Sequence, residues 1–567
     1  MHIDIVPNRN SRPTYLLREA YREGKKVRKR TLANLSSLSD EQLTGIRAIL
    51  QGQQLRAVDE LFEVVGSRAH GHVEAVRVAM SKLGFMKLLG SRPSRERELV
   101  AAMVAARVLA PQTKLATTRW WQTTTLADEF GVADADEDEL YAAMDWLLAR
   151  QERIEQKLAA RHLADGGLVL YDLSSSYFEG TQCPLARLGY SRDGKRGKLQ
   201  VNYGVLTDGR GCPVAVSVHE GNTSDPETLL PAVDRVRTQF GLDRFVMVGD
   251  RGMISHKGIE AMRERGGVDW ITALKSVSIR ALIQQGHVQI GLFDERNLFE
   301  LTHPDYPGER LIACRNPQLA EYRAHKREAL LQATEKQLEK VRASVTAGRL
   351  SGQDKIGVRV GRVVNQYKVA KHFDLAITDT SFGYARNAER IAMEAALDGL
   401  YIIRTSLPAV QMDAAECVRR YKSLADVERA FRTLKGVDLK IRPIHHRLED
   451  RVRAHIFLCL LAYYVEWHMR EAWRELMFAD EDQAVKRVRD PVAPAKRSAA
   501  AERKAASREL EDGTPAHSFG TLIAELATIV RNTCQTPNAA QSASFDIVTR
   551  SNPKQQRALE LLQTIRM

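Results

Sequence analysis

Five apolar runs between residues 167 and 275 constrain the fold of this chain more than any other feature of its sequence. The runs LVLYDLSSS (168–176), LQVNYGVLTD (199–208) and PVAVSVHEG (213–221) predict three strands, with a tight turn after the second. A helix is expected from Ser224, because a proline follows in what would be its first turn. The strand RFVMVGD (244–250), a helix over 257–265 and the strand DWITALK (269–275) complete the pattern.

This order of three strands, helix, strand, helix and strand is that of a ribonuclease-H-like α/β domain. Many activities share such an order, so it does not give a function by itself. A chain of 567 residues exceeds one hydrophobic core. We therefore expect a multidomain α/β protein whose ribonuclease-H-like catalytic core is interrupted by a β-rich insertion and preceded by a helical DNA-binding region.

The predicted domains follow from changes of pattern along the chain. They are a small β-meander (1–38), a helical, DNA-end-binding region (39–160), the first part of the core (165–278), a β-rich insertion with a charged helix (279–406), the second part of the core (407–475), and a basic linker with a C-terminal helical region (476–567).

Several local patterns support these boundaries. Ser39 and Gln42 form a capping box that would open the helical region, which is expected to run to about residue 156. In that region the basic residues Arg95, Arg97, Lys114 and Arg119 indicate either a DNA-binding surface or an ordinary solvated face.

Within the insertion we expect short strands, one of them GVRVGRVV (357–364), around a charged helix near 321–345. The apolar spacing of that helix favours simple docking over a dimer zipper. Residues 485–513 are rich in Ala, Arg and Lys, and are typical of a mobile basic segment or lid.

The charge balance indicates a polyanionic partner. Lys and Arg number 84 against 71 Asp and Glu, and the pI is about 9.4. The most apolar run, residues 456–465, is about half the length of a membrane span, so it predicts a buried helix and leaves nucleic acid rather than a membrane as the partner. The N-terminus lacks the layout of a signal peptide. Six scattered cysteines predict neither disulfides nor a structural zinc site, in keeping with a reducing cytoplasm.

Two aspartates stand out because each lies in an apolar strand. Asp172 follows LVLY, and Asp250 ends the run RFVMVG. A carboxylate in such a position is costly to desolvate unless it is paired or binds a cation. Aspartates on adjacent strands would bring their carboxylates together, which a divalent metal ion would make tolerable. Taken singly, each is also consistent with an ordinary capping or turn aspartate.

A third acid lies in a predicted helix that Ser423 would cap and Gly436 would end. Glu428 and Lys435 are seven residues apart and share one face of this helix, about 10 Å from each other. Arg432 lies on the same face. Without other information the helix also fits a solvated amphipathic helix.

The segments YDLSSSYFEG (171–180), VMVGDRGMIS (246–255) and YKSLADVERAFRTLKG (421–436) resemble the three catalytic blocks of insertion-sequence DDE transposases. More narrowly they resemble the IS-four family, whose last block has tyrosine, arginine, glutamate and lysine at fixed offsets. Tyr421, Glu428 and Lys435 match, but Leu424 stands where the family has arginine, and Arg429 or Arg432 could supply that charge.

The resemblance implies a bacterial enzyme of the cytoplasm, associated with the nucleoid, that nicks DNA at the ends of a mobile element and joins them to a target. Asp172, Asp250 and Glu428 would hold two Mg²⁺ ions, with Mn²⁺ as a substitute. Tyr421 and Lys435 would position a phosphate. Further DNA or phosphate contacts are expected from one set of basic residues: Arg432, Arg251, Arg192, Lys195, Arg196 and Lys198. The partners would be double-stranded terminal inverted repeats, target DNA and a second copy of the chain in a dimer.

Two other functions stay open. A nuclease of the same fold would cleave DNA without joining it, and a transposase-derived protein without catalysis would only bind it. The three intact acids count against the second. His445 and His446 do not predict a metal site, because adjacent histidines do not share a helix face.

Overall fold

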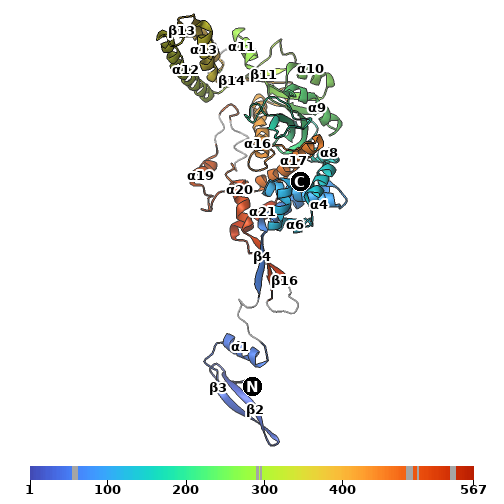
Figure 1. Cartoon of the computed structure of the whole chain (residues 1–567). Helices are drawn as coiled ribbons and strands as arrows, with labels where there is room; N and C mark the ends of the chain where they lie inside the picture. The colour runs from blue at the N-terminus through green and yellow to red at the C-terminus, as the bar shows by residue number, and fades with distance from the viewer. Residues whose placement is uncertain are drawn as a thin grey trace. The chain divides into compact units, whose positions relative to one another are not determined.

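The computed structural model describes residues 1–53, 62–288, 293, 297–480, 490–493, 497–536 and 544–566 (Figure 1). The chain forms two compact units. The smaller contains residues 1–68 and 529–550, and the larger contains residues 69–528 and 551–567.

The smaller unit begins with the predicted meander. Strands β1 (His2–Val6), β2 (Thr14–Glu23) and β3 (Lys26–Asn34) pair antiparallel in that order. Helix α1 (Asp40–Leu50) follows, and Ser39 and Gln42 form the expected capping box.

A second three-stranded sheet interrupts the region 39–160 that the sequence predicted to be helical. It has the order β16-β15-β4 and contains β4 (Glu63–Ala69), β15 (Val530–Gln535) and β16 (Ser544–Val548). The partner of β4 lies more than 400 residues away in sequence, so local periodicity gave no sign of this pairing.

The larger unit starts with the predicted helical region. Its helices are α2 (Gly71–Lys82), α3 (Phe85–Leu89), α4 (Arg95–Leu109), α5 (Lys114–Trp120), α6 (Leu126–Glu129), α7 (Glu137–Leu148) and α8 (Gln151–His162). Helix α4 packs against α7 and against α17 (Glu449–Ala472), the buried helix expected around residues 456–465. In the described part of the chain no single helix has the length and apolar character of a membrane span, although the bent pair 95–109 and 114–123 meets these criteria.

Most of the basic residues noted in this helical region are paired with acidic side chains or buried, so they are not available as an exposed basic surface. Arg95 pairs with Asp134 and Glu139, and Arg97 pairs with Glu98. Lys114 is buried. Arg119 alone of the four lies exposed, so the expected basic face is not formed by these residues.

A mixed eight-stranded sheet forms the centre of the larger unit, in the order β10-β11-β14-β9-β8-β5-β6-β7. The predicted core strands are present as β5 (Leu168–Tyr177), β6 (Gln200–Asp208), β7 (Pro213–Glu220), β8 (Phe245–Val248) and β9 (Val268–Ala273). Strand β5 is antiparallel to β6 and parallel to β8, which is parallel to β9.

Three strands of the region 279–406 extend this sheet. They are β10 (Leu298–Leu301), β11 (Arg310–Arg315) and β14 (Leu400–Thr405), and β14 pairs antiparallel with β9. The same region contains helices α11 (Ser276–Gln284) and α14 (Ala388–Ala395) and the hairpin β12 (Phe373–Ile377) and β13 (Phe382–Arg386).

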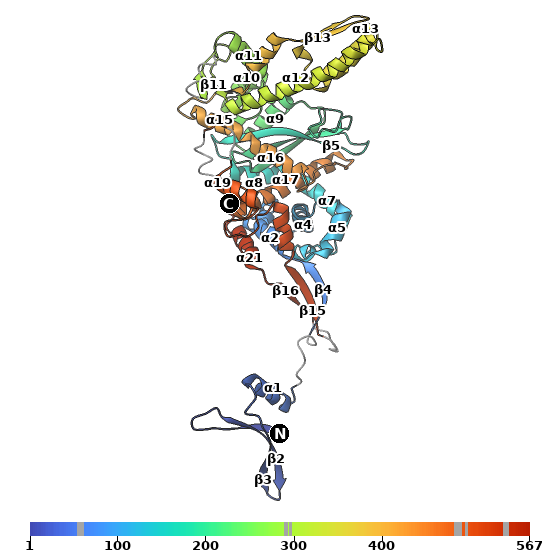
Figure 2. The same cartoon turned by 90° about the vertical axis from the view of Figure 1, so that its left-hand side faces the viewer.

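Helices cover both faces of the sheet (Figure 2). On one side lie α9 (Asp225–Thr238) and α10 (His256–Arg265), the two helices predicted between the strands. On the other lie α16 (Leu424–Lys435) and α17, with α15 (Ala414–Lys422) before them.

The charged helix predicted near 321–345 is α12 (Pro317–Thr346), and it docks against its neighbour as expected. That neighbour, α13 (Gln353–Gln366), shows that the strand predicted at 357–364 is wrong. Ile356, Val360 and Val364 fall four residues apart on one helix face and are buried against α12. Packing therefore overrides the β-branched composition of this segment.

After α17 the described chain contains α19 (Ala499–Ser507), α20 (Phe519–Ala527) and α21 (Pro553–Gln563). The basic segment predicted at 485–513 falls partly outside the described residues, at 485–489 and 494–496. Within it, α19 is anchored because the buried Lys504 ammonium donates to the carbonyls of Glu475 and Met477.

Candidate active site

The alternation of β5 decides which side of the sheet Asp172 faces. Ser174, two residues along, pairs with Tyr203 of β6, whose ring lies 5.8 Å from that of Phe431 in α16. Residues two apart on a strand share a face, so Asp172 also faces α16. The preceding Tyr171 faces the opposite side.

Strands β5 and β8 bring the two aspartates together. Leu168 pairs with Val246 and Leu170 with Val248 in parallel register. Two residues further on, the same register sets Asp172 beside Asp250. Burial, with a smaller contribution from the nearby charge of Asp250, raises the pKa of Asp172 to about 7. These two carboxylates therefore share one site, as the sequence predicted.

Asp250 is held by the turn that follows β8. Its Oδ1 accepts hydrogen bonds from the backbone N–H groups of Gly252, at 2.9 Å, and Met253, at 2.8 Å. Asp172 is held less firmly, since its Oδ1 accepts one bond from the N–H of Leu173 at 2.8 Å. The turn gives Asp250 a fixed orientation without occupying both carboxylate oxygens in these bonds.

Tyr421, near the end of α15, marks the position of the third acid. Burial raises its pKa to about 12, and the charges of Asp250, Glu428 and Asp172 all raise it as well. Its hydroxyl therefore lies in the electrostatic field of all three carboxylates. Glu428 itself is exposed on α16. The charges of all three acids thus reach the tyrosine that the sequence singled out, but among the described residues the oxygens of Asp172, Asp250 and Glu428 do not form a group within 4.8 Å of one another.

The start of α16 differs from the prediction. Ser423 has helical backbone angles and makes no side-chain cap. Its hydroxyl instead donates to the carbonyl of Arg420, because α15 runs almost directly into α16. Gly436 ends the helix as expected.

Lys435 does not stand alone at the end of α16. Its Nζ lies 3.0 Å from Oδ1 of Asp193, whose side chain is fully buried and also pairs with Arg442. The N–H of Tyr177 donates to the other oxygen of Asp193 at 3.0 Å. Burial lowers the pKa of Lys435, and Asp193 opposes that shift. Asp193 and Arg442 were missed from the sequence, because an Asp-Gly pair in a basic loop is typical of an ordinary turn.

The basic loop 191–198 divides into two parts. The half-buried Arg192 pairs with Asp225, and its positive charge lowers the pKa of Asp172. Its backbone N–H donates to the Ser175 hydroxyl at 3.0 Å, which holds the loop against β5. The other three predicted basic residues are exposed: Lys195, Arg196 and Lys198.

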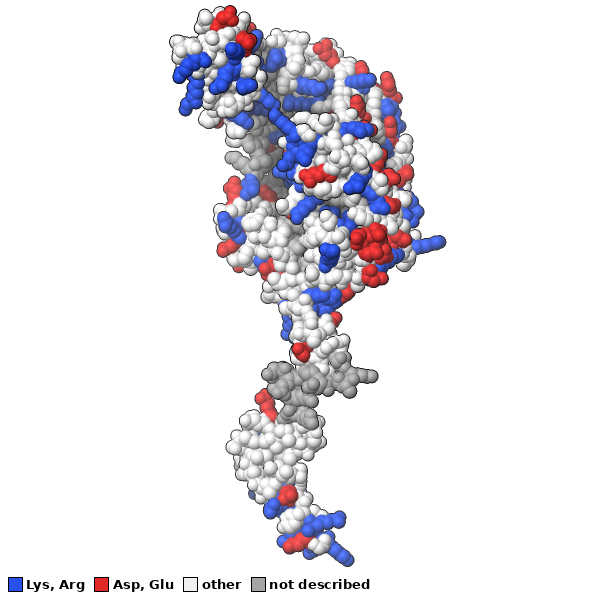
Figure 3. All heavy atoms as spheres, in the orientation of Figure 1, with Lys and Arg blue, Asp and Glu red and all other residues white. Residues whose placement is uncertain are grey.

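The remaining predicted contacts lie on the surface. Arg251 is exposed, and its charge lowers the pKa of Tyr421, so it lies near the site. Arg432 is also exposed. Arg429, one candidate to replace the arginine absent at Leu424, pairs with Asp426 at 2.9 Å. Figure 3 shows Lys and Arg side chains of the larger unit gathered below the pair α12 and α13.

The donor set suits a hard divalent cation. Asp172, Asp250 and Glu428 offer carboxylate oxygens, which Mg²⁺ and similar ions prefer. The two aspartates repel each other, and this repulsion contributes to the raised pKa of Asp172. A bound cation would relieve it, so the donor chemistry fits a metal ion, and side-chain movement would have to bring the oxygens of the three acids within ligand spacing.

Residues 167–465, more than half of the chain, match the family described as "Transposase DDE domain". Residues 3–63 match "IS1634 family transposase, N-terminal domain". The narrower IS-four signature is not shown by these matches and stays a prediction.

No curated protein matches the chain. Among solved structures, the chain is similar to a piggyBac transposase synaptic complex with hairpin DNA. The identity is 8%, the TM-score is 0.33, and the likeness covers 81% of this chain and 76% of that one.

Proposed function

Because this chain belongs to the insertion-sequence DDE transposases, and is thus a DNA transposase, we propose that Asp172, Asp250 and Glu428 are its catalytic carboxylates. The observation that carries this assignment is the Tyr421 hydroxyl, whose pKa is raised by all three charges. All three acids lie within the range 167–465 that matches the DDE domain.

The five core strands support a ribonuclease-H-like assignment for this domain. In space they follow the order β7-β6-β5-β8-β9, so β5, the first of these five strands in sequence, lies at the centre. Asp172 lies on that central strand, and Asp250 follows the strand beside it. We propose that the acids lie at the edge of such a core.

The family uses divalent metal ions, and we propose two Mg²⁺ ions, replaceable by Mn²⁺, held by the three carboxylates. Held by these residues, such ions would supply Lewis-acid activation of the attacking water or DNA 3′-hydroxyl and stabilisation of the leaving oxygen. Asp172 must be ionised to act as a ligand, and the charge of Arg192 favours that form. The two backbone bonds to Asp250 keep its carboxylate oriented for the same purpose.

Tyr421 and Lys435 are proposed to position the phosphate that reacts. The pKa of Tyr421 lies far above neutrality, so its hydroxyl keeps its proton and donates a hydrogen bond. Asp193 fixes the ammonium of Lys435 at 3.0 Å, so the lysine is oriented before DNA arrives. Arg251, Arg432 and the exposed residues of loop 191–198 would contact the DNA backbone.

The DNA partners are proposed to be the terminal inverted repeats of the element and a target duplex, bound by a dimer. We propose that the N-terminal region, whose residues 3–63 match a transposase N-terminal domain, recognises the element ends. Binding that rests on lysine and arginine contacts to phosphates should weaken steeply as salt is raised.

Purified protein, Mg²⁺ and a DNA fragment with the element's terminal repeats provide the test. We expect nicking followed by strand transfer. Asp250→Asn and Glu428→Gln should each lower the cleavage rate at least about a thousandfold, since metal-ion stabilisation of the transition state is worth several kcal/mol. Asp269→Asn is the matched control, because Asp269 lies on β9 opposite Val246, away from the site.

The outcomes separate the open functions. Cleavage without joining would identify a nuclease and refute the strand-transfer proposal. Tight DNA binding without cleavage by the unmodified chain would refute catalysis altogether. Unchanged cleavage by both acidic variants would refute the assignment of these residues.

A further inference from the structure

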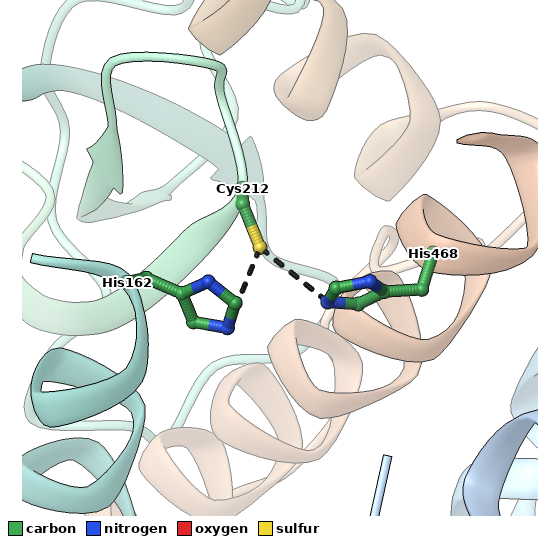
Figure 4. Close-up of side chains that lie close together, drawn as sticks. All are labelled: His162, Cys212 and His468. Carbon is green, nitrogen blue, oxygen red and sulfur yellow. Dashed lines mark hydrogen bonds between the residues drawn. The ribbon is translucent and has the colours of Figure 1, made fainter. Parts of the chain in front are cut away.

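Three side chains from distant parts of the larger unit point toward one another (Figure 4). His162 is the last residue of α8, Cys212 lies in the turn between β6 and β7, and His468 is on α17. The sulfur of Cys212 is 4.0 Å from Nε2 of His162 and 3.8 Å from Nε2 of His468.

We propose that His162, Cys212 and His468 bind a zinc ion. One ligand atom from each residue lies within 4.8 Å of the other two. Among the described residues, this is the group of three His, Cys, Asp or Glu side chains that has such metal-ligand spacing. Thiolate and imidazole are the donors that zinc prefers, whereas Mg²⁺ prefers oxygen. The proposal is independent of the carboxylate site.

The distances are close to those of a zinc site. Bond lengths of about 2.3 Å to sulfur and about 2.0 Å to nitrogen place tetrahedral ligand atoms about 3.5 Å apart. The two sulfur–nitrogen distances exceed this by only a few tenths of an ångström. Small side-chain movements would therefore bring the three ligand atoms to the distances of a tetrahedral zinc site. The Tyr464 hydroxyl, 3.0 Å from Nε2 of His162, sets an oxygen donor beside the fourth position.

The protonation of the imidazoles suits metal binding. Burial lowers the pKa of His162 to about 4 and that of His468 to about 3, so both rings are neutral at physiological pH. Burial raises the pKa of the Cys212 thiol, which therefore carries a proton when no metal is bound. Zinc binding would form a sulfur–metal bond and release that proton to solvent.

The turn that carries Cys212 is held in place by Asp208. Oδ1 of Asp208 accepts from the N–H groups of Arg210, at 2.8 Å, and Cys212, at 3.0 Å. Gly211 has a positive φ of 84° and packs so tightly that an added Cβ would lie 2.7 Å from Cβ of Asp426 in α16. A zinc ion would thus fix a turn against which the helix of Glu428 rests.

A second buried cysteine–histidine pair, Cys459 and His455 in α17, provides a matched control. The sulfur of Cys459 lies 3.9 Å from Nε2 of His455, and both residues are buried. This pair is not part of a three-residue group of metal-ligand spacing among the described residues. Cys459→Ser therefore removes a buried cysteine beside a histidine without touching the proposed site.

Metal content and cobalt spectra of the full-length chain test the proposal. We expect about one zinc per chain, measured by elemental analysis after removal of loosely bound metal, in the unmodified protein and in Cys459→Ser. Cys212→Ser and His468→Gln should lose it. Replacing zinc by Co²⁺ should give a thiolate-to-cobalt charge-transfer band that Cys212→Ser lacks. A carboxylate site cannot produce this band, and Asp250→Asn should keep it, so the result is separable from the proposed catalytic function.

Folding failure of a variant would not leave the question open. Stripping the unmodified protein with a chelator and restoring it with Co²⁺ reports on the same site without mutation. We also expect zinc to slow amide hydrogen exchange in residues 424–435. Absence of both zinc and the cobalt band in the folded, unmodified protein would overturn the proposal, as would a band retained by Cys212→Ser.

Discussion

Asp193→Asn removes the negative charge that two cations share near the end of α16. The Asp193 side chain is fully buried, and Lys435 is only 10% exposed. Arg442, the second cation, is 32% exposed and has partial access to water. Asparagine keeps an oxygen that can accept the hydrogen bond from the N–H of Tyr177, so the substitution mainly removes charge.

The expected loss of stability in Asp193→Asn follows from the buried positive charge of Lys435, which the variant leaves without its acidic partner. Removing one member of a buried ion pair costs about 3–5 kcal/mol, because the other charge is left uncompensated. Solvation of Arg442 reduces the penalty, so we expect a loss of about 3 kcal/mol. Lys435→Met in the same chain removes the buried charge, and the double variant should recover about 1–3 kcal/mol relative to Asp193→Asn.

Urea unfolding of the variants measures these differences, with amide exchange of residues 178–199 and 424–445 as a local readout. Glu220→Gln is the control, since Glu220 pairs with Arg187 at 3.2 Å with both side chains about half exposed. That variant should lose less than about 1 kcal/mol. A loss below about 1 kcal/mol for Asp193→Asn, or a double variant less stable than Asp193→Asn, would refute the reasoning.

Three further changes test the packing of the larger unit. Unfolded, Lys114 holds its proton up to its ordinary pKa of 10.5, but burial lowers the pKa in the folded chain to about 7. Between pH 7 and 10 the unfolded state thus binds more protons than the folded state, so the free energy of unfolding rises with pH. Lys114→Met should flatten this rise, measured by urea titrations across that pH range. An unchanged dependence of the unfolding free energy on pH would contradict the argument. Arg404→Met should cost about 2–3 kcal/mol in urea unfolding, because buried Glu309 loses two bonds of 2.6 and 2.5 Å but keeps its ion pair with Arg263 at 3.1 Å; a loss under about 1 kcal/mol would count against this. Gly204→Ala places a Cβ 2.2 Å from the Tyr171 hydroxyl, so stability should fall by about 1–3 kcal/mol or more, and a wild-type melting temperature would disprove the clash.

The strands that carry the two aspartates were predictable because their signal is local. An apolar run of strand length around residues 168–176, and another at 244–250, needs no knowledge of distant partners. An acid within such a run is already informative, since burying a carboxylate is costly unless it is hydrogen-bonded, paired or bound to a cation. The order of these strands and helices likewise gave the centre of the sheet.

Other features depended on packing between distant segments. Residues 357–364 have strand-like composition but form part of α13, because one apolar face meets α12. Strand β4 forms only because residues from the C-terminal part complete its sheet. Likewise, β10, β11 and β14 extend the central sheet, although their sequences indicated only a separate insertion.

The sequence by itself determined the central strands, the placement of Asp172 and Asp250 within them, and, through resemblance, the choice of Glu428. Tertiary structure decided that Asp193 holds Lys435 and that His162, Cys212 and His468 meet, although His162 and His468 are 306 residues apart (468 − 162). The physical reason is the range of the interactions. A strand is indicated by the apolar pattern of residues that are neighbours in sequence. Buried ion pairs and ligand clusters, in contrast, form only after distant segments have packed together.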